Sequence, residues 1–231
     1  MPNVARRHQL QGNLLYHVFN RGNAKSVVFR DLEDYENFTD ILLRYRIERG
    51  VRFYNYVIMP NHYHLLLEIN DPDQLSSIMA GINKSYSWYY HKTYKTVGYL
   101  WQGRFKSKPV QKDGYLQVCA RYIERNPLAQ GIVSNPEDYL YSSARHYILG
   151  LTDRLLSEHP FYSEFGNNSE ERRSSYKNWL LDFDEDVDEE SCLLDFDTPL
   201  GDTLFSSKLY NDGGRYKPRR RGRKGRGRKK L

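Results

Sequence analysis

Two histidines one residue apart are the first candidates for chemistry in this chain of 231 residues. His62 and His64 lie in a run that begins at Tyr56 and reads Tyr-Val-Ile-Met-Pro-Asn-His-Tyr-His-Leu-Leu-Leu-Glu, which has the composition of β-strands. Because alternate residues of a strand point to the same face, the two imidazoles should project side by side. Such a pair can bind a divalent metal ion, although a His-x-His triplet alone is a weak signal.

The segment from Lys84 to Arg125 combines positive charge with aromatic rings. It has nine Lys or Arg against two acidic side chains, with ten aromatic residues among them. Cations bind phosphates and aromatic faces stack on unpaired bases, so this mixture favours single-stranded or hairpin nucleic acid. The predicted DNA-binding residues are Arg21, Arg104, Lys106, Lys108 and Arg121. A metal pair together with a nucleic-acid surface indicates phosphodiester chemistry.

Phosphoryl transfer also needs a nucleophile, and here tyrosine is the candidate. One stripe of a helix that begins after Asp113 would carry Tyr115, Cys119, Tyr122 and Asn126. Steps of four, three and four residues stay on one helical face. Tyr115 lies in the first turn, where the partial positive charge of the helix N-terminus would stabilise a phenolate. The alternative is that this ring only packs in the core, because the chain has 20 tyrosines.

The surrounding sequence predicts the elements that position these residues. Strand patterns cover 14–19, 51–59, the histidine run and 107–111, and helical patterns cover 31–50, 73–91 and 115–125. Asp31 and Asp113 are expected N-caps, and Asn126-Pro127 should end the third helix. The tight break at Pro60-Asn61 predicts a hairpin. The order β-α-β-β-α-β, with one more α-helix, predicts an α+β, ferredoxin-like antiparallel sheet with helices on one face.

Charge is distributed very unevenly along the chain. The formal net charge of +6 divides into +5 for residues 1–178, −10 for residues 179–202 and +11 for residues 203–231. The Gly/Arg-rich end should be disordered and is a candidate nucleic-acid arm, unless it folds back on the acidic block. A mean hydropathy of −0.79 and the lack of a long apolar run argue against a membrane span. Two distant cysteines indicate neither a disulfide framework nor a zinc site.

Four motifs in order resemble the REP-associated tyrosine transposases, which belong to the single-tyrosine HUH nucleases and are related to small insertion-sequence transposases. The motifs are Tyr-His-Val-Phe-Asn-Arg-Gly-Asn from Tyr16, Met-Pro-Asn-His-Tyr-His-Leu from Met59, Leu-Trp-Gln-Gly-Arg-Phe-Lys-Ser from Leu100, and Tyr115-Leu116 followed by Arg-Tyr-Ile-Glu-Arg-Asn-Pro from Arg121. The resemblance implies a catalytic domain over 10–150. Beyond it we expect a helical extension over 151–179, an acidic linker over 180–207 and a basic disordered tail over 208–231.

The resemblance implies that His62 and His64 hold Mg²⁺ or Mn²⁺ against a scissile phosphate. It implies further that Tyr115 attacks single-stranded DNA that carries a hairpin, forming a 5′-phosphotyrosine link and releasing a 3′-hydroxyl. Related enzymes supply a third ligand one turn after the nucleophile, where this chain has Cys119, a poor ligand for Mg²⁺. Asn126 or Glu68 could take its place. We expect a cytoplasmic, nucleoid-associated bacterial protein that acts as a monomer or homodimer.

Other functions remain open from the sequence. A non-catalytic DNA or RNA hairpin-binding protein descended from such an enzyme would keep the basic and aromatic segment. A zinc hydrolase is disfavoured, because no third His or Cys has a normal zinc spacing. His17, in the middle of the first strand, is expected to be a core histidine rather than a ligand, and Asn61 is expected to orient the histidine strand.

Overall fold

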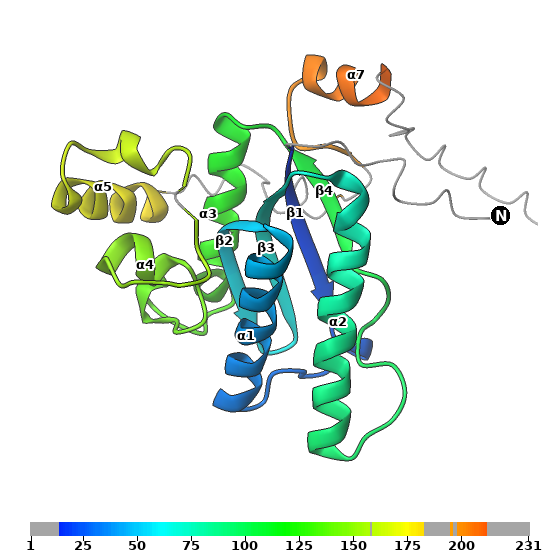
Figure 1. Ribbon diagram of the computed structural model, residues 1–231. Helices are drawn as coiled ribbons and strands as arrows, with labels where there is room; N and C mark the ends of the chain where they lie inside the picture. Colours follow the sequence, from blue (N-terminus) through cyan, green and yellow to red (C-terminus); the bar gives the residue numbers. More distant parts are fainter. Residues whose placement is uncertain (1–13, 158, 183–194, 196–197, 212–231) are drawn as a thin grey trace, which may run out of the picture.

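In the computed structural model a four-stranded antiparallel sheet carries helices on both faces (Figure 1). The structure describes residues 14–157, 159–182, 195 and 198–211. The first half of the chain forms β1 (Leu14–Arg21), η2 (Asn23–Lys25), α1 (Leu32–Arg49), β2 (Arg52–Met59), β3 (His62–Ile69) and α2 (Pro72–Tyr94). The second half forms β4 (Lys106–Val110), α3 (Gly114–Ala129), η3 (Pro136–Asp138), α4 (Ala144–Leu149), η4 (Tyr162–Phe165), α5 (Ser169–Leu181) and α7 (Thr203–Asn211).

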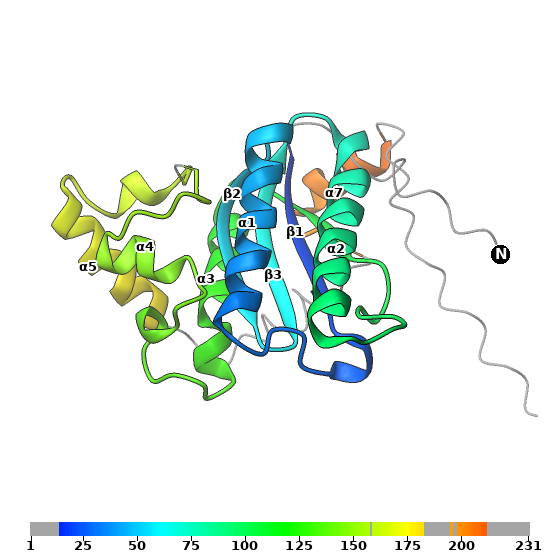
Figure 2. The same ribbon diagram turned by 60° about the horizontal axis from the view of Figure 1, so that its bottom comes forward.

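The strand order β2-β3-β1-β4 confirms the expected ferredoxin-like α+β fold. β3 lies antiparallel between β1 and β2, and β2 and β3 form the predicted hairpin around Pro60-Asn61. Helices α1 and α2 cover one face of the sheet, and the additional helix α3 covers the opposite face (Figures 1 and 2). The sheet face under α3 is the one that carries His62 and His64.

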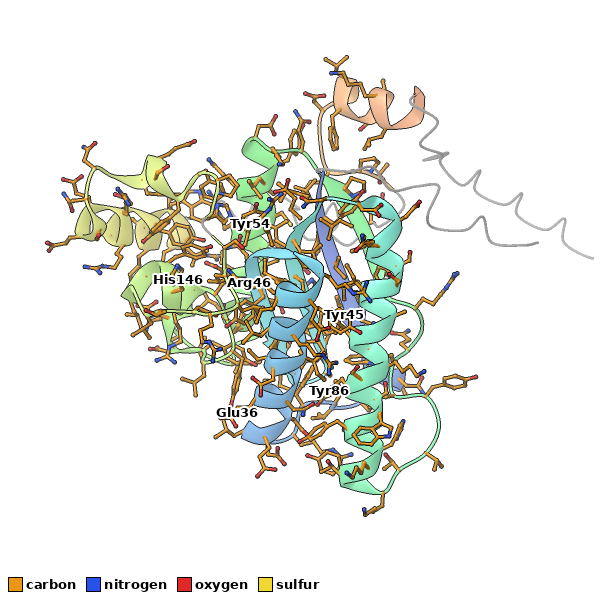
Figure 3. All side chains as sticks on the ribbon, viewed as in Figure 1. Glu36, Tyr45, Arg46, Tyr54, Tyr86 and His146 are labelled. Carbon is orange, nitrogen blue, oxygen red and sulfur yellow. The ribbon has the colours of Figure 1, made fainter. Side chains whose placement is uncertain are left out.

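An aromatic core fills the space between the sheet and the helices α1 and α2. Its fully or nearly fully buried rings are Phe29, Phe38, Tyr63, Tyr86 and Trp101. Tyr45 and Tyr86 point into the space between α1 and α2 (Figure 3), and Gly81 allows the close approach of the helices, since a Cβ there would lie 2.0 Å from the Tyr45 hydroxyl. This rigid layer supports the strands that carry the histidines.

The helix ends agree with the capping predictions, apart from two differences. Asp31 and Asp113 cap α1 and α3 as expected, but α2 begins at Pro72 with Asp71 as its cap rather than at Asp73. Helix α3 does not end at Asn126-Pro127 but continues to Ala129. Pro127 lacks an N–H and so removes one hydrogen bond of the helix. Because it lies only two residues before the helix ends, the last turn still forms. This continuation keeps Asn126 in helical geometry.

The segment after the acidic block also differs from the expected linker and tail. Helix α7 spans Thr203–Asn211, so the expected disorder from residue 208 does not apply to its last turn. Leu200 pairs with Val110 at the free edge of β4, and Leu209 is buried. The backbone pairing with β4 and the burial of Leu209 show that this short element belongs to the folded part of the chain. Residues 183–194 and 212–231, which hold most of the acidic block and of the basic tail, lie outside the described residues.

Candidate active site

The two histidines of β3 lie side by side on the face covered by α3. His62 is the register partner of Arg21 on β1, and His64 is the partner of Phe19. Their ring centroids are 5.2 Å apart, and the two residues are 3% and 1% exposed. The alternation of the strand therefore brings the imidazoles together as the spacing predicted.

Both histidines are neutral at pH 7. Burial, which penalises the charged ring, lowers the pKa of His62 to about 4, and burial with the neighbouring His17 and His62 lowers the pKa of His64 well below its ordinary value. A neutral imidazole has one N–H donor and one nitrogen lone pair. Each ring can therefore act as a metal ligand without first losing a proton at neutral pH.

His62 has an oxygen atom against each of its ring nitrogens. Its Nδ1 lies 2.6 Å from Asn61 Oδ1, and its Nε2 lies 3.2 Å from Asn126 Oδ1. The Gln130 amide donates to the same Asn126 oxygen at 2.9 Å, which supports the orientation of this amide. A neutral ring has only one proton, and we assign it to Nδ1 because the contact to Asn61 is the shorter; the Nε2 lone pair then faces an oxygen lone pair. Two acceptors that face each other without a proton between them repel, and a cation bound between them would satisfy both.

Helix α3 brings Asn126 to the histidines because it runs antiparallel to β3. Its C-terminal end reaches His62, and one turn earlier the Tyr122 ring lies edge-on to His64 at 5.3 Å between centroids. The same tyrosine contacts His17 at 6.0 Å. The cluster around His62 and His64 thus includes a tyrosine and an amide oxygen from the same helix.

Tyr115 lies at the other end of α3. Three residues before it, Lys112 donates to Glu68 Oε1 at 2.6 Å. Glu68 is six residues beyond His62 on β3, so these two residues are about 20 Å apart along the strand. Along the helix itself, eleven residues place Tyr115 about 16 Å from Asn126. The structure therefore does not bring the sequence-predicted nucleophile together with His62 and Asn126. A periodic stripe shows which helical face a residue occupies but not which end of the sheet it meets.

Glu68, the other alternative to Cys119 as a third ligand, does not reach the histidines. Glu68 is neutralised where it lies, by Arg52 at 3.0 Å, by Lys112 and by the Tyr54 hydroxyl at 2.7 Å. Cys119 is fully buried, and burial raises the pKa of its thiol. Of the three residues considered in the sequence, Asn126 is the one with a hydrogen-bonding contact to a histidine among the described side chains.

A buried carboxylate that the sequence analysis missed anchors α3 to the C-terminal extension. Glu124 is fully buried, and it accepts hydrogen bonds from Asn55 at 2.8 Å, from Tyr176 at 2.9 Å and from Ser143. Burial raises the pKa of Glu124 to about 7, although all three hydrogen bonds act in the opposite direction. The only signal in the sequence that could have indicated this role is an acidic residue inside an apolar helical segment. The hydrogen-bond partners could not be predicted, because they lie 19 to 69 residues away in the chain.

Two arginines of α3 strengthen this anchor. Arg125 donates to the Leu180 carbonyl at 2.8 Å, and the Arg121 guanidinium lies 4.7 Å from the centre of the Trp179 ring. Together with Glu124, these contacts hold the α3 turns on either side of Tyr122 against α5. The predicted DNA-binding residue Arg121 is thus engaged by α5.

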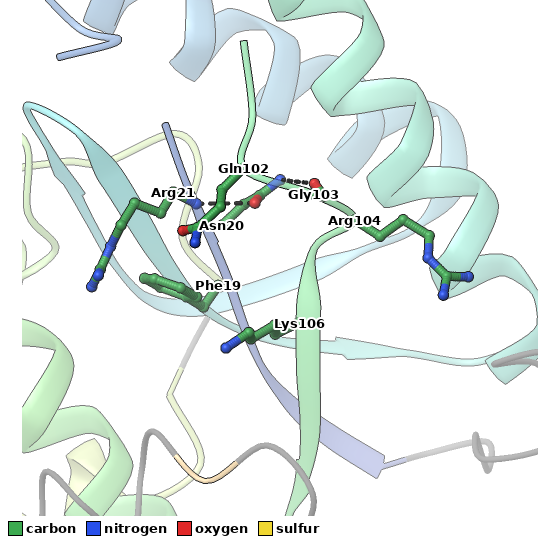
Figure 4. A pocket seen from close by; sticks show the side chains of 7 residues that line it. All are labelled: Phe19, Asn20, Arg21, Gln102, Gly103, Arg104 and Lys106. Atoms are coloured by element: carbon green, nitrogen blue, oxygen red, sulfur yellow. Dashed lines mark hydrogen bonds between the residues drawn. The ribbon is translucent and has the colours of Figure 1, made fainter. Parts of the chain in front are cut away.

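A pocket of about 380 Å³ opens beside the histidines at the end of β1 (Figure 4). It is lined by Phe19, Asn20, Arg21, Gln102, Gly103, Arg104 and Lys106. The side chains of Arg21 and Arg104 point to opposite sides of it (Figure 4), and the Arg21 guanidinium lies 5.2 Å from the centre of the Phe19 ring. Three predicted DNA-binding cations, Arg21, Arg104 and Lys106, therefore line one pocket. Lys108, by contrast, is 1% exposed and lies inside the protein, so it offers no surface for DNA.

The donor atoms near His62 fit a divalent ion. The described residues contain no cluster of three or more His, Cys, Asp or Glu, so the protein ligands would be two imidazole nitrogens and the Asn126 amide oxygen. Two ligand atoms about 2.1 Å from one ion and at right angles to each other are about 3 Å apart. The observed separation of 3.2 Å between His62 Nε2 and Asn126 Oδ1 agrees with this geometry. Because all three donors are neutral, the ion would keep its full charge for a phosphate.

Comparisons with known proteins place this arrangement in a family. The sequence model described as "Transposase IS200 like" matches residues 11–126, about half of the chain. A search of curated proteins finds no match. A solved structure of a REP-associated tyrosine transposase bound to a REP hairpin superposes with a TM-score of 0.53 at 19% identity, covering 68% of this chain and 92% of that one. At this identity the likeness shows the shared fold. No helix in the described part of the chain is long and apolar enough to cross a membrane.

Proposed function

The chain belongs to the family of IS200-like transposases, and from this premise we propose that it is a metal-dependent transposase or endonuclease that cleaves and rejoins single-stranded DNA carrying a hairpin. The reaction would pass through a 5′-phosphotyrosine intermediate. The observation that carries the proposal is the convergence of His62, Asn126 and a tyrosine ring at one end of the sheet face beneath α3. The protein would act in the cytoplasm at the nucleoid, as a monomer or homodimer.

We propose Tyr122, rather than Tyr115, as the nucleophile. Tyr122 packs directly against His64, and it lies one helical turn before Asn126, which touches His62. Tyr115 lies near Lys112 and the ion-paired Glu68. A nucleophile has to reach the phosphate that the metal ligands hold, and of the two tyrosines on this stripe of α3 Tyr122 is the nearer to those ligands.

His62, His64 and Asn126 would hold Mg²⁺ or Mn²⁺. When bound, the ion would polarise the scissile phosphate and hold it in place. Asn61 keeps the His62 Nε2 lone pair directed at the site by accepting the Nδ1 proton. Burial of both rings excludes water that would compete for the nitrogen donors.

The bonds in the proposed step balance within the tyrosine and the DNA. The Tyr122 oxygen forms a bond to phosphorus, the bond from phosphorus to the 3′-oxygen breaks, and the phenolic proton ends on that 3′-oxygen. The link exchanges one phosphate ester for another, so a later 3′-hydroxyl can reverse it. No nucleotide hydrolysis is required, and the chain has no Gly-x-x-x-x-Gly-Lys-Ser/Thr loop.

The pocket beside the histidines supports a path for the DNA backbone. Arg21, Arg104 and Lys106 line it without an acidic side chain among the lining residues. Cations placed in this way neutralise phosphates near the reacting one, while the Phe19 ring contributes an aromatic wall. Arg21 links the two sites, because it lines the pocket and is the register partner of His62.

Covalent trapping tests the proposal. The full chain is incubated with end-labelled single-stranded hairpin DNA and Mn²⁺, and denaturing gels are read for a protein–DNA adduct. Tyr122→Phe should abolish the adduct yet bind the hairpin nearly normally, since only the phenolic oxygen is lost.

Tyr115→Phe is the matched control, because it removes the same atom from the same helix and should leave adduct formation near the wild-type level. Loss of the adduct in Tyr115→Phe alone would reverse the assignment of the nucleophile. Hairpin binding without any adduct in the wild type would instead support a non-catalytic binding protein.

A further inference from the structure

His17 is a fully buried histidine that contacts a proposed metal ligand. It lies in the middle of β1, and its Nε2 is 2.8 Å from His64 Nδ1. The two rings stack with their centroids 5.1 Å apart and their planes 20° from parallel. The sequence alone suggested only a core residue, since His17 and His64 are 47 residues apart in the chain.

A hydrogen bond between His17 Nε2 and His64 Nδ1 requires a proton on one of these two nitrogens and a lone pair on the other. Burial, with a smaller effect of the Lys108 charge, lowers the pKa of His17 to about 3, and His64 is neutral for the reasons given above. Two arrangements satisfy a hydrogen bond between two neutral rings. Either His17 Nε2–H donates to His64 and leaves the proton of His64 on Nε2, or His64 Nδ1–H donates to His17 and leaves a lone pair on Nε2. Only the second arrangement makes His64 Nε2 a ligand.

We propose that His17 is a positioning residue that accepts the Nδ1 proton of His64 and so keeps the His64 Nε2 lone pair available for a divalent cation. This inference rests on the proposed function of the histidine pair. It gives a purpose to a polar side chain that the catalytic step itself does not use. His17 does not touch the DNA or the ion in this scheme, and acts only through His64.

The neighbouring ring supplies a comparison that supports this role. Asn61 Oδ1 lies against His62 Nδ1 in the same way that His17 Nε2 lies against His64 Nδ1. Each proposed ligand therefore has its own acceptor behind it, which is the usual arrangement for metal-binding histidines. An amide oxygen can only accept, whereas an imidazole nitrogen can accept or donate, so His64 depends on the tautomer of His17.

Two further rings hold His64 in this orientation. Phe19 lies 4.8 Å and Tyr122 5.3 Å from the His64 ring, measured between centroids. They leave the imidazole little room to turn its Nδ1 away from His17. On the other side of His17 its register partner on β4 is Lys108, whose charge disfavours a second proton on His17.

Metal binding by the full chain without DNA provides the test. Mn²⁺ is titrated and the free ion is followed by electron paramagnetic resonance. His17→Phe keeps a ring but removes the acceptor, and it should weaken Mn²⁺ binding by about 10- to 100-fold. His17→Gln restores an acceptor oxygen and should recover most of the loss. His159→Phe is the matched control: His159 is also buried and hydrogen-bonded through its Nε2, to Asn55 Oδ1 at 2.8 Å, but lies outside the site, so Mn²⁺ affinity should not change.

Nitrogen-15 spectra of the metal-free protein give a second readout that does not depend on metal. Wild-type His64 should show a protonated Nδ1 and an unprotonated Nε2, and this preference should be lost in His17→Phe. The opposite tautomer in the wild type, or wild-type Mn²⁺ affinity in a folded His17→Phe, would overturn the proposal.

The two readouts also separate this inference from the proposed function. Failure of the wild type to bind Mn²⁺ would count against the metal site, and the nitrogen spectra would then decide the role of His17 alone.

Discussion

The two ends of the sheet face beneath α3 differ in how their polar groups are satisfied. At one end Glu68 on β3 is held by Arg52, Lys112 and the Tyr54 hydroxyl, so its charge is already neutralised. At the other end, six residues away on the same strand, His62 faces amide oxygens and has no charged partner within hydrogen-bonding distance among the described side chains. Helix α3 offers a tyrosine near each end, Tyr115 near Glu68 and Tyr122 near the histidines.

This contrast shows why charge alone is a poor guide to a metal site. A carboxylate is the better ligand for Mg²⁺ in isolation, but two cations and a hydroxyl already satisfy Glu68. The histidine end keeps neutral donors with a lone pair that no proton satisfies. A cation should bind most favourably where two acceptors face each other and no donor satisfies them.

The largest expected effect comes from removing a donor at the histidine end. His62→Ala or His64→Ala should reduce DNA cleavage by several orders of magnitude at any Mn²⁺ concentration tested, because a site with so few protein ligands cannot lose one. Glu68→Gln changes the other end and should keep cleavage within a few-fold of the wild type while lowering stability. Cleavage rates on a labelled hairpin measure the effects at both ends of the sheet face. Full activity of the His62 and His64 variants in EDTA would show that the reaction does not need a metal.

Acid should destabilise the two ends over different pH ranges. The folded-state pKa values of His62 and His17, about 4 and about 3, lie below the ordinary value of 6.5, so the unfolded chain binds protons first and stability falls as pH drops below 6.5. Between its folded-state and unfolded-state pKa values, each of these histidines lowers the free energy of unfolding by up to about 1.4 kcal/mol per pH unit.

Glu68 also loses its stabilisation as pH falls, but at lower pH than the histidines. Burial raises its pKa, but hydrogen bonds from Lys112 and Tyr54 outweigh it and bring the net pKa below 4.5. Its stabilisation is therefore present above that pH and is lost only below it. Urea unfolding of the metal-free protein at pH 7, 5.5 and 4 tests the order. His17→Gln should flatten the loss between pH 7 and 5.5, whereas Glu68→Gln should not; equal slopes in all three proteins would contradict the assignment.

The smallest expected effect concerns the part of the basic tail that lies outside the described residues, residues 212–231. If its Lys and Arg residues bind phosphates, deleting it should weaken binding to every DNA sequence similarly, and each lost contact should reduce the salt slope of log K by roughly 0.7–0.9. Hairpin selectivity and the choice of tyrosine should survive, because both belong to the folded domain. An unchanged salt slope would favour pairing of the tail with the acidic block instead.

Local patterns in the sequence were sufficient to predict much of this protein. The two-residue period places His62 and His64 on one face, the order of elements predicts the ferredoxin-like sheet, and Asp31 and Asp113 cap their helices as expected. Each of these features depends on residues close together in the chain, where backbone geometry and a few side-chain hydrogen bonds decide the outcome.

Only the tertiary structure distinguishes the surroundings of the two tyrosines, and our proposal of Tyr122 rests on that difference. Tyr115 and Tyr122 share one helical stripe, so periodicity cannot distinguish them. The distinction comes from the direction in which α3 crosses the sheet and from the last turn beyond Asn126, and both depend on contacts with α5 and β2 far away in the sequence. The same holds for His17 and Glu124, whose roles arise from burial next to distant partners, because burial removes the water that would otherwise satisfy a polar group.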